Sequence, residues 1–181
     1  MINNFDKFIP CFQALEHGEF YIVSIRKEEK LIKNYCIYKT EDFSDIQNEI
    51  ITICDALNAT AFVTINKFNN NDIKWNLGKC VNYALNPEHS FDANDIEFII
   101  DDISYWKPKF TAIEVDHKVY NQYLDIIAKM TEERFYAVHD YGVNYIVVSK
   151  NFDTYNFSQE LMIHKLPKHY ELKSEVPLYR K

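Results

Sequence analysis

The spacing of hydrophobic residues changes several times along this chain, and the order of these changes constrains the fold most. Residues 20–26 and 32–39 alternate as strands do, and a turn rich in lysine and glutamate separates them. From Thr40 onward, isoleucine and leucine recur at the spacing of an amphipathic helix. A strand rich in β-branched residues is predicted next, over 59–66. The first part of the chain therefore predicts a hairpin, a helix and a further strand.

The second part of the chain predicts the order strand, helix, strand, strand. An apolar run ends in Glu114 and Asp116, and a helical pattern over 119–130 follows it. Strands are predicted over 134–139 and 144–149, on either side of a turn. This β-α-β-β order is typical of half of a ferredoxin-like or RNA-recognition-like core.

Further elements complete the prediction. Helices are expected from Asn3 or Asn4 to Leu15, over 73–85, over 96–103 and around Phe157 and Leu161, and an extended or irregular tail over about 165–181. The chain has 181 residues, of which 47% are hydrophobic and only 3 are glycine. That composition suits one domain over 1–181 with a proper core. We expect an α+β fold, in which helices cover a mixed or antiparallel sheet.

The charge balance argues against a general nucleic-acid-binding protein. The chain has 27 acidic and 20 basic residues, a net charge of −7, whereas nonspecific binding to phosphates needs a basic surface. A local contact stays open because basic residues cluster in two places, at Lys27, Lys30 and Lys33 and again at Lys165, Lys168, Lys173, Arg180 and Lys181.

The cysteines and the hydrophobic runs bear on the compartment. Four cysteines are widely spaced, without a Cys-x-x-Cys pair, which predicts reduced thiols; Cys36 and Cys54 lie in apolar patterns and are expected in the core. No apolar run approaches the roughly 18 residues that span a bilayer. We therefore expect a cytoplasmic protein without a membrane partner.

Glu114 and Asp116 are the strongest candidate site in the sequence. Alternate residues of a strand share a face, so the two carboxylates can share a divalent cation such as Mg²⁺ or Mn²⁺ while Ile113 and Val115 point into the core. The alternative is that the pair is the solvated end of an ordinary strand.

Six short segments resemble a group of small phage and bacterial proteins related to the archaeo-eukaryotic primase superfamily. In that group an apolar hairpin and helix lead to a strand with Asn, an acidic-x-acidic strand end, a Gly-x-His strand, a late His-Lys and a Leu-Tyr ending. The matching segments are residues 20–25, 61–66, 113–116, 142–144, 163–165 and 176–179.

The resemblance implies a primase-like core in which Glu114 and Asp116 hold divalent metal ions and polar residues of the later strands contact a nucleotide. The resemblance implies that Asn144, His164 and Lys165 bind nucleotide. His139 is a further candidate, because it stands just before the turn and would lie near the acidic pair if their strands are neighbours. Asn144 stands where the family has histidine, and Leu166 stands where an acid would add a metal ligand. Both departures make polymerising activity doubtful.

Three functions follow from these observations. The first is a phage- or mobile-element-type protein of primase-like fold, with a decayed or repurposed site that binds nucleotide or divalent metal. The second is a protein-interaction module or inhibitor, without catalytic activity, that meets a host protein through an acidic, tyrosine-rich surface. The third is an active metal-dependent nucleotidyltransferase. The sequence contains no phosphate-binding glycine loop or nucleophile elbow, which disfavours kinases and hydrolases.

Overall fold

The alternating segments near the start of the chain form an antiparallel hairpin, as predicted, in the computed structural model of this protein. Its strands are β2 (Glu19–Lys27) and β3 (Lys30–Ile37). The structure describes residues 1–9, 14–28, 30–39, 41–69, 110–131, 143–149 and 152–181. The predicted helices over 73–85 and 96–103 and the predicted strand over 134–139 lie outside these residues.

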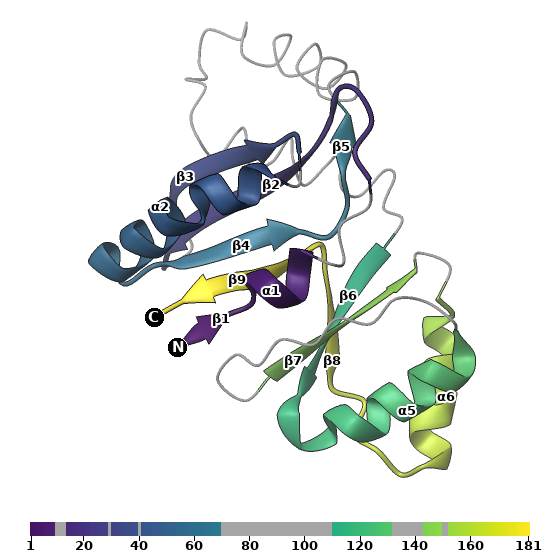
Figure 1. The fold of residues 1–181 in the computed structure, drawn as a ribbon. Coiled ribbons are helices and arrows are strands. Elements are labelled where there is room, and N and C mark those ends of the chain that lie inside the picture. Colours follow the sequence, from purple (N-terminus) through teal and green to yellow (C-terminus); the bar gives the residue numbers. More distant parts are fainter. Residues whose placement is uncertain (10–13, 29, 40, 70–109, 132–142, 150–151) are drawn as a thin grey trace, which may run out of the picture.

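The hairpin belongs to the larger of two sheets (Figure 1). Its main strands run in the order β1-β9-β4-β2-β3, and every pairing is antiparallel. The short strand β5 pairs with the beginning of β2. The bounds of the strands not yet given are β1 (Ile2–Asn3), β4 (Thr60–Thr64), β5 (Phe68–Asn69) and β9 (Glu175–Arg180).

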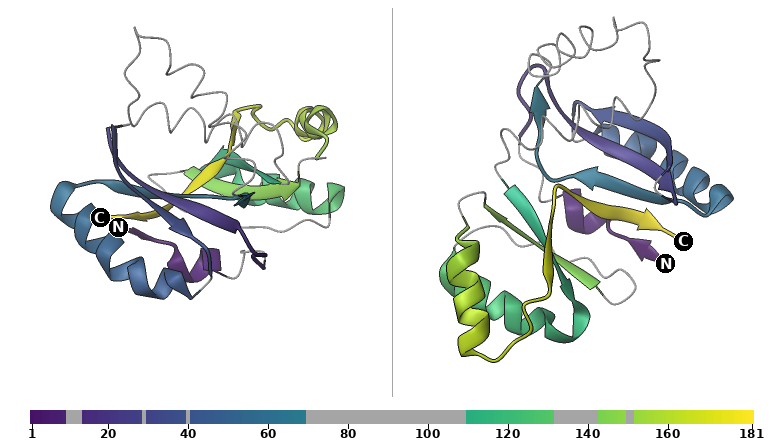
Figure 2. Two further views of the ribbon diagram at one scale, coloured as in Figure 1. Left: turned by 90° about the horizontal axis from the view of Figure 1, so that it is seen from above. Right: turned by 180° about the vertical axis from the view of Figure 1, so that it is seen from behind.

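Two helices cover one face of this sheet (Figure 2). The helix α2 (Asp42–Leu57) confirms the predicted apolar stripe and buries Phe43, Ile50 and Cys54 against the strands. It ends at Asn58, which adopts the left-handed conformation with φ of 52°, a common helix stop. The helix predicted to reach Leu15 is described only as α1 (Phe5–Phe8). Cys36 is exposed, contrary to the expectation of a core position, because it lies on the sheet face that α2 leaves uncovered.

The C-terminal segment contributes an interior strand to the sheet. Where the sequence predicted an extended or irregular tail, β9 runs between β1 and β4, and its Val176 and Leu178 are fully buried. Pro177 cannot donate a ladder hydrogen bond, and prolines inside sheets are confined to edges and bulges. The register of β4 and β9 shifts between Ala61 and Phe62, where Pro177 lies. This bulge accommodates the proline.

A smaller sheet of three strands packs beside the first, in the order β7-β6-β8. Its strands are β7 (Val143–Ser149), β6 (Phe110–Asp116) and β8 (Tyr170–Lys173). The helices α5 (Tyr120–Met130) and α6 (Thr154–Ile163) cover one face and bury Tyr123, Ile127, Phe157 and Leu161. The other face joins the core of the first sheet through Ala112, Tyr145 and Val147. The protein therefore has an α+β fold, as expected from the sequence.

The side chain of one asparagine adds hydrogen bonds between the two sheets. Just beyond the end of β4, the Asn66 side chain donates a hydrogen bond from Nδ2 to the Phe110 carbonyl, at 2.8 Å, and accepts one at Oδ1 from the Phe110 amide, at 2.9 Å. This side chain thus bonds the first residue of β6 in the way a neighbouring strand would. None of the described helices is long and apolar enough to cross a bilayer.

Candidate functional site

The strand β6 carries the acidic pair at its C-terminal end. Ile113 and Val115 are buried beneath α5 and α6, as the alternation of the sequence predicts. Glu114 points to the opposite face, where it is half-buried, and Asp116 at the strand end is exposed. The two acids therefore do not lie in the helix-covered core of this sheet.

Glu114 is engaged by two residues of its own chain. The Tyr145 hydroxyl donates a hydrogen bond to Glu114 Oε2 at 2.9 Å, and Lys173 Nζ lies 3.5 Å from the same oxygen. Lys173 also bonds Glu171 Oε2 at 2.6 Å, and Glu171 lies directly opposite Glu114 on β8. Two facing carboxylates repel each other. The Lys173 ammonium group contacts both carboxylates. It therefore occupies the position where a metal ion shared by the two carboxylates would bind.

The pKa values of Lys173 and Glu171 reflect the same contacts. The hydrogen bond to Glu171, supported by the charge of Glu114, raises the pKa of Lys173 above its usual range. The hydrogen bond from Lys173 lowers the pKa of Glu171. Each shift stabilises the charged form, so Lys173 and Glu171 are both ionised near neutral pH.

Replacing Lys173 with methionine is expected to destabilise the protein only in a defined pH window. The raised pKa of Lys173 stabilises the fold below its unfolded pKa of about 10.4, and this contribution is lost as the pH rises through the folded pKa. The lowered pKa of Glu171 stabilises the fold above its unfolded pKa of about 4.3, and this contribution is lost as the pH falls through the folded pKa. Because partly exposed ion pairs are screened by water, we expect the Glu114–Lys173 contact to contribute at most about 1 kcal/mol.

Urea unfolding of the wild type and of Lys173→Met at several pH values measures this window. The difference between the two proteins should be constant between the two unfolded pKa values and should shrink in acid. A difference that stays the same at pH 3 would show that the lysine acts through packing and not through its charge.

Asp116 has a local structural role at the end of β6. Its Oδ1 accepts a hydrogen bond from the Lys118 amide at 2.7 Å and so caps the short 3-10 helix η2 (His117–Val119). An acidic residue is well suited to such a position because it satisfies a backbone donor that the first turn leaves free. The second candidate metal ligand is therefore also bonded within its own chain.

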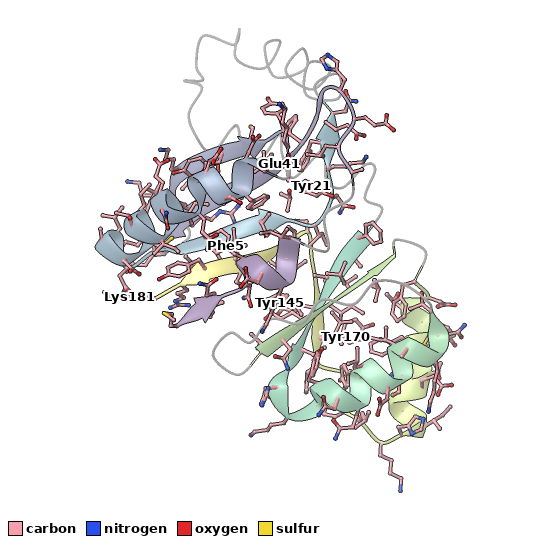
Figure 3. The ribbon with its side chains drawn as sticks, viewed as in Figure 1. Phe5, Tyr21, Glu41, Tyr145, Tyr170 and Lys181 are labelled. Carbon is pink, nitrogen blue, oxygen red and sulfur yellow. The ribbon has the colours of Figure 1, made fainter. Side chains whose placement is uncertain are left out.

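Asn144 faces away from Glu114. It pairs with Val115 across β6 and β7, it is fully buried, and its Nδ2 lies 3.4 Å from Nδ1 of His117. The residue directly across from Glu114 is Tyr145, which lies between the two sheets (Figure 3). Tyr145 is the partner that the sequence prediction missed. Alternation along β7 does put Tyr145 on the sheet face opposite Asn144. The sequence alone does not reveal the register between β6 and β7, so it could not show that Tyr145 lies across from Glu114.

His164 and Lys165 lie at the C-terminal end of α6. His164 Nε2 lies 3.6 Å from Glu160 Oε2, one helical turn earlier, and Lys165 has a positive φ of 55° after the helix end. His164 borders a hollow of about 600 Å³ between α5 and α6, whose lining does not include either acid of the pair. Neither residue lines the hollow beside Glu114 and Asp116. His139 lies outside the described residues.

A separate hollow of about 300 Å³ lies beside Glu114 and Asp116. Its other lining residues include Lys168, His169 and Glu171, from the segment between α6 and the end of β8. Of these three residues, only Lys168 belongs to the basic cluster that the sequence shows near the C-terminus. In the part of the chain that the structure describes, no three His, Cys, Asp or Glu side chains are grouped so that they could hold a metal ion.

Comparisons of the chain with protein-family models, with curated proteins and with solved structures found no match. The contacts of the described residues therefore carry the functional interpretation. Those contacts place the acidic pair in the framework of the second sheet, with a small hollow of mixed charge beside it.

Proposed function

We propose that this protein is a protein-interaction module in which the acidic pair stabilises the fold. The observation that carries this proposal is the engagement of Glu114 by Lys173 and Tyr145. A divalent cation at Glu114 Oε2 would compete with the ammonium group of Lys173, which lies between the two facing carboxylates. Binding a partner requires no such displacement.

The surface that best suits a partner is formed by β8 and one side of α6, here called the β8 flank. Among the described residues, β8 pairs only with β6, so it is an edge strand of its sheet. Leu172 on this strand keeps 52% of its surface exposed. Edge strands present backbone groups to which a strand of another chain can be added.

Exposed apolar side chains of α6 extend this flank. Ser158 contacts the hydroxyl of Tyr170 on β8, at 3.2 Å, so this side of the helix lies next to the strand. Tyr155 and Met162 are three residues before and four after Ser158 and therefore share its side. They are 71% and 47% exposed. Exposed aromatic and methionine side chains are typical of interaction surfaces.

Leu172→Lys should weaken partner binding by about thirtyfold or more if the β8 flank is the interface. A charge at the centre of an apolar contact removes a binding contribution of the order of 2 kcal/mol or more, about thirtyfold in affinity. The measurement is a pull-down from a lysate of the source cells, with the captured protein quantified against the bait. Wild type and a Glu114→Gln, Asp116→Asn double variant should capture the same protein in stoichiometric amount.

The matched control is Leu57→Lys, because Leu57 is a similarly exposed leucine, at 43%, at the end of α2. This control should bind like the wild type. Equal capture by Leu172→Lys and wild type would contradict the proposed interface, and capture that requires Glu114 would contradict the structural role of the acids.

Nucleotide or divalent-metal binding at a primase-like site is a second proposal. It is favoured by the hollow beside Glu114 and Asp116, where Lys168 and His169 offer donors for a phosphate. In this view the chain is a phage- or mobile-element-type protein whose site has been repurposed, as the resemblance implies. An active nucleotidyltransferase is the least supported proposal, because Lys173 already balances Glu114.

A further inference from the structure

The turn between α6 and β8, residues 164–169, carries positive charge at the end of the β8 flank. It contains Lys165, Lys168 and two histidines, and no acidic residue, although the chain as a whole has a net charge of −7. Both lysines are exposed, and within the described ranges neither side chain forms an ion pair with an acid. Glu171, the acid of β8 itself, is already bonded by Lys173 at 2.6 Å. The turn therefore offers two unpaired charges to an acidic ligand.

Hydrogen bonds fix the path of this turn. The Leu166 amide donates to the Leu161 carbonyl at 2.8 Å, which closes the last turn of α6. Lys165 lies between them, with a φ of 55°, in the left-handed position that glycine usually fills at a helix end. The Tyr123 hydroxyl of α5 donates to the carbonyl of Pro167. A ligand that contacts the two lysines therefore loses little affinity to the ordering of this backbone.

Beside the turn, the β8 flank combines an apolar surface with an open strand edge. Leu172 lies opposite Ile113, on the sheet face that α5 and α6 cover, so it shares this face with the exposed Met162 of α6. Among the described strands β8 pairs only with β6, so its outer backbone groups are open to a further strand. A lipid surface would suit the lysines and Leu172, but it would leave those backbone groups without hydrogen-bond partners. The combination therefore favours a peptide over a membrane.

We infer that the partner of the β8 flank is an acidic peptide segment that adds to β8 as an extended strand. This inference rests on the proposed function and names the chemistry of its partner. An apolar side chain of the segment packs on Leu172, while its backbone bonds the open edge of β8. Its acidic residues lie beyond the N-terminal end of β8, where they pair with Lys165 and Lys168.

Fluorescence anisotropy with a labelled peptide, Asp-Glu-Val-Thr-Val-Thr-Val-Glu-Asp, tests the charge requirement. Its valines share one face of a strand, and the acids at both ends allow either strand direction. Wild type should bind this peptide about tenfold more tightly than the same peptide with Asn and Gln in place of its acids, as expected for two partly exposed ion pairs.

The variants place the charge on the turn. The Lys165→Gln, Lys168→Gln double variant should bind the acidic peptide about tenfold more weakly than the wild type. The matched control is the Lys27→Gln, Lys30→Gln double variant, which removes two exposed lysines from the hairpin of β2 and β3. It has the same net charge as the first variant and should bind like the wild type.

Methylated peptides test the addition of a strand. The amides of alternate residues point to the same edge of a strand, so methylation of the valine amides and methylation of the threonine amides block opposite edges. One of these two peptides should lose binding and the other should keep it, and any other result overturns the inference. Equal binding of the acidic and amide peptides, or of the lysine double variant and the wild type, also overturns it.

Two outcomes separate this inference from the proposed function. If a lysate yields a partner that needs Leu172 but the wild type does not bind the acidic peptide, the interaction module stands and the acidic partner is wrong. If no partner is captured and no peptide binds, both proposals are wrong. Binding of the wild type to vesicles that contain phosphatidylserine, but not to the acidic peptide, would overturn the inference in favour of a membrane.

Discussion

Leu178→Ala is expected to lower the free energy of unfolding by about 2–5 kcal/mol, the usual cost of truncating a buried leucine. Leu178 is fully buried and lies in β9, between β1 and β4. The alanine would leave a cavity between the sheet and its helices that the surrounding strands cannot close without losing their pairing. Urea unfolding followed by circular dichroism measures the change.

The control for this prediction is Leu172→Ala, in which a half-exposed leucine of β8, an edge strand of the smaller sheet as described, is truncated. Its effect should be much smaller, because little apolar surface leaves water when this residue folds. If Leu178→Ala cost no more than Leu172→Ala, β9 would not be an interior strand.

Asn66→Ala is expected to lower the free energy of unfolding by about 1–3 kcal/mol, because it removes two hydrogen bonds of roughly 0.5–1.5 kcal/mol each. The side chain is 9% exposed and bonds both the amide and the carbonyl of Phe110. These bonds join the segment after β4 to the first residue of β6. The variant therefore weakens the junction between the two sheets, and the effect can be measured by urea unfolding.

Two comparisons sharpen the Asn66 prediction. Asn66→Asp keeps the oxygen acceptor but loses the donor, so it should be destabilised nearly as much as the alanine variant. Asn121→Ala, at an exposed position of α5, should unfold like the wild type. An Asn66→Ala protein as stable as Asn121→Ala would mean that this contact does not hold the sheets together.

The elements that the sequence predicted well are those with a local signal. The hairpin of β2 and β3, the stripe of α2, the strand β6 and the helix α5 each show their own period of hydrophobic residues, and the structure has them near the predicted bounds. The segment at β9 was harder to predict because Pro177 normally argues against an interior strand. Only the bulge opposite Ala61 and Phe62 makes the proline compatible with the sheet.

The candidate site depended on pairings that a single sequence does not contain. The alternation in β6 correctly put Ile113 and Val115 in the core and Glu114 on the other face. The partner of Glu114, however, is Lys173, which is 59 positions later in the chain and reaches it only because β8 pairs with β6. In the same way, the hollow lined by Arg26, Thr60 and Arg180 exists because β4 lies between β2 and β9.

We propose that Glu114 and Asp116 stabilise the fold and do not bind a metal. Titration of Mn²⁺ into the wild type and into the Glu114→Gln, Asp116→Asn double variant, with and without ADP, tests it most directly. We predict the same Mn²⁺ binding curves for both proteins under both conditions. Mn²⁺ binding to the wild type that the double substitution abolishes would contradict the claim and would favour a functional primase-like site.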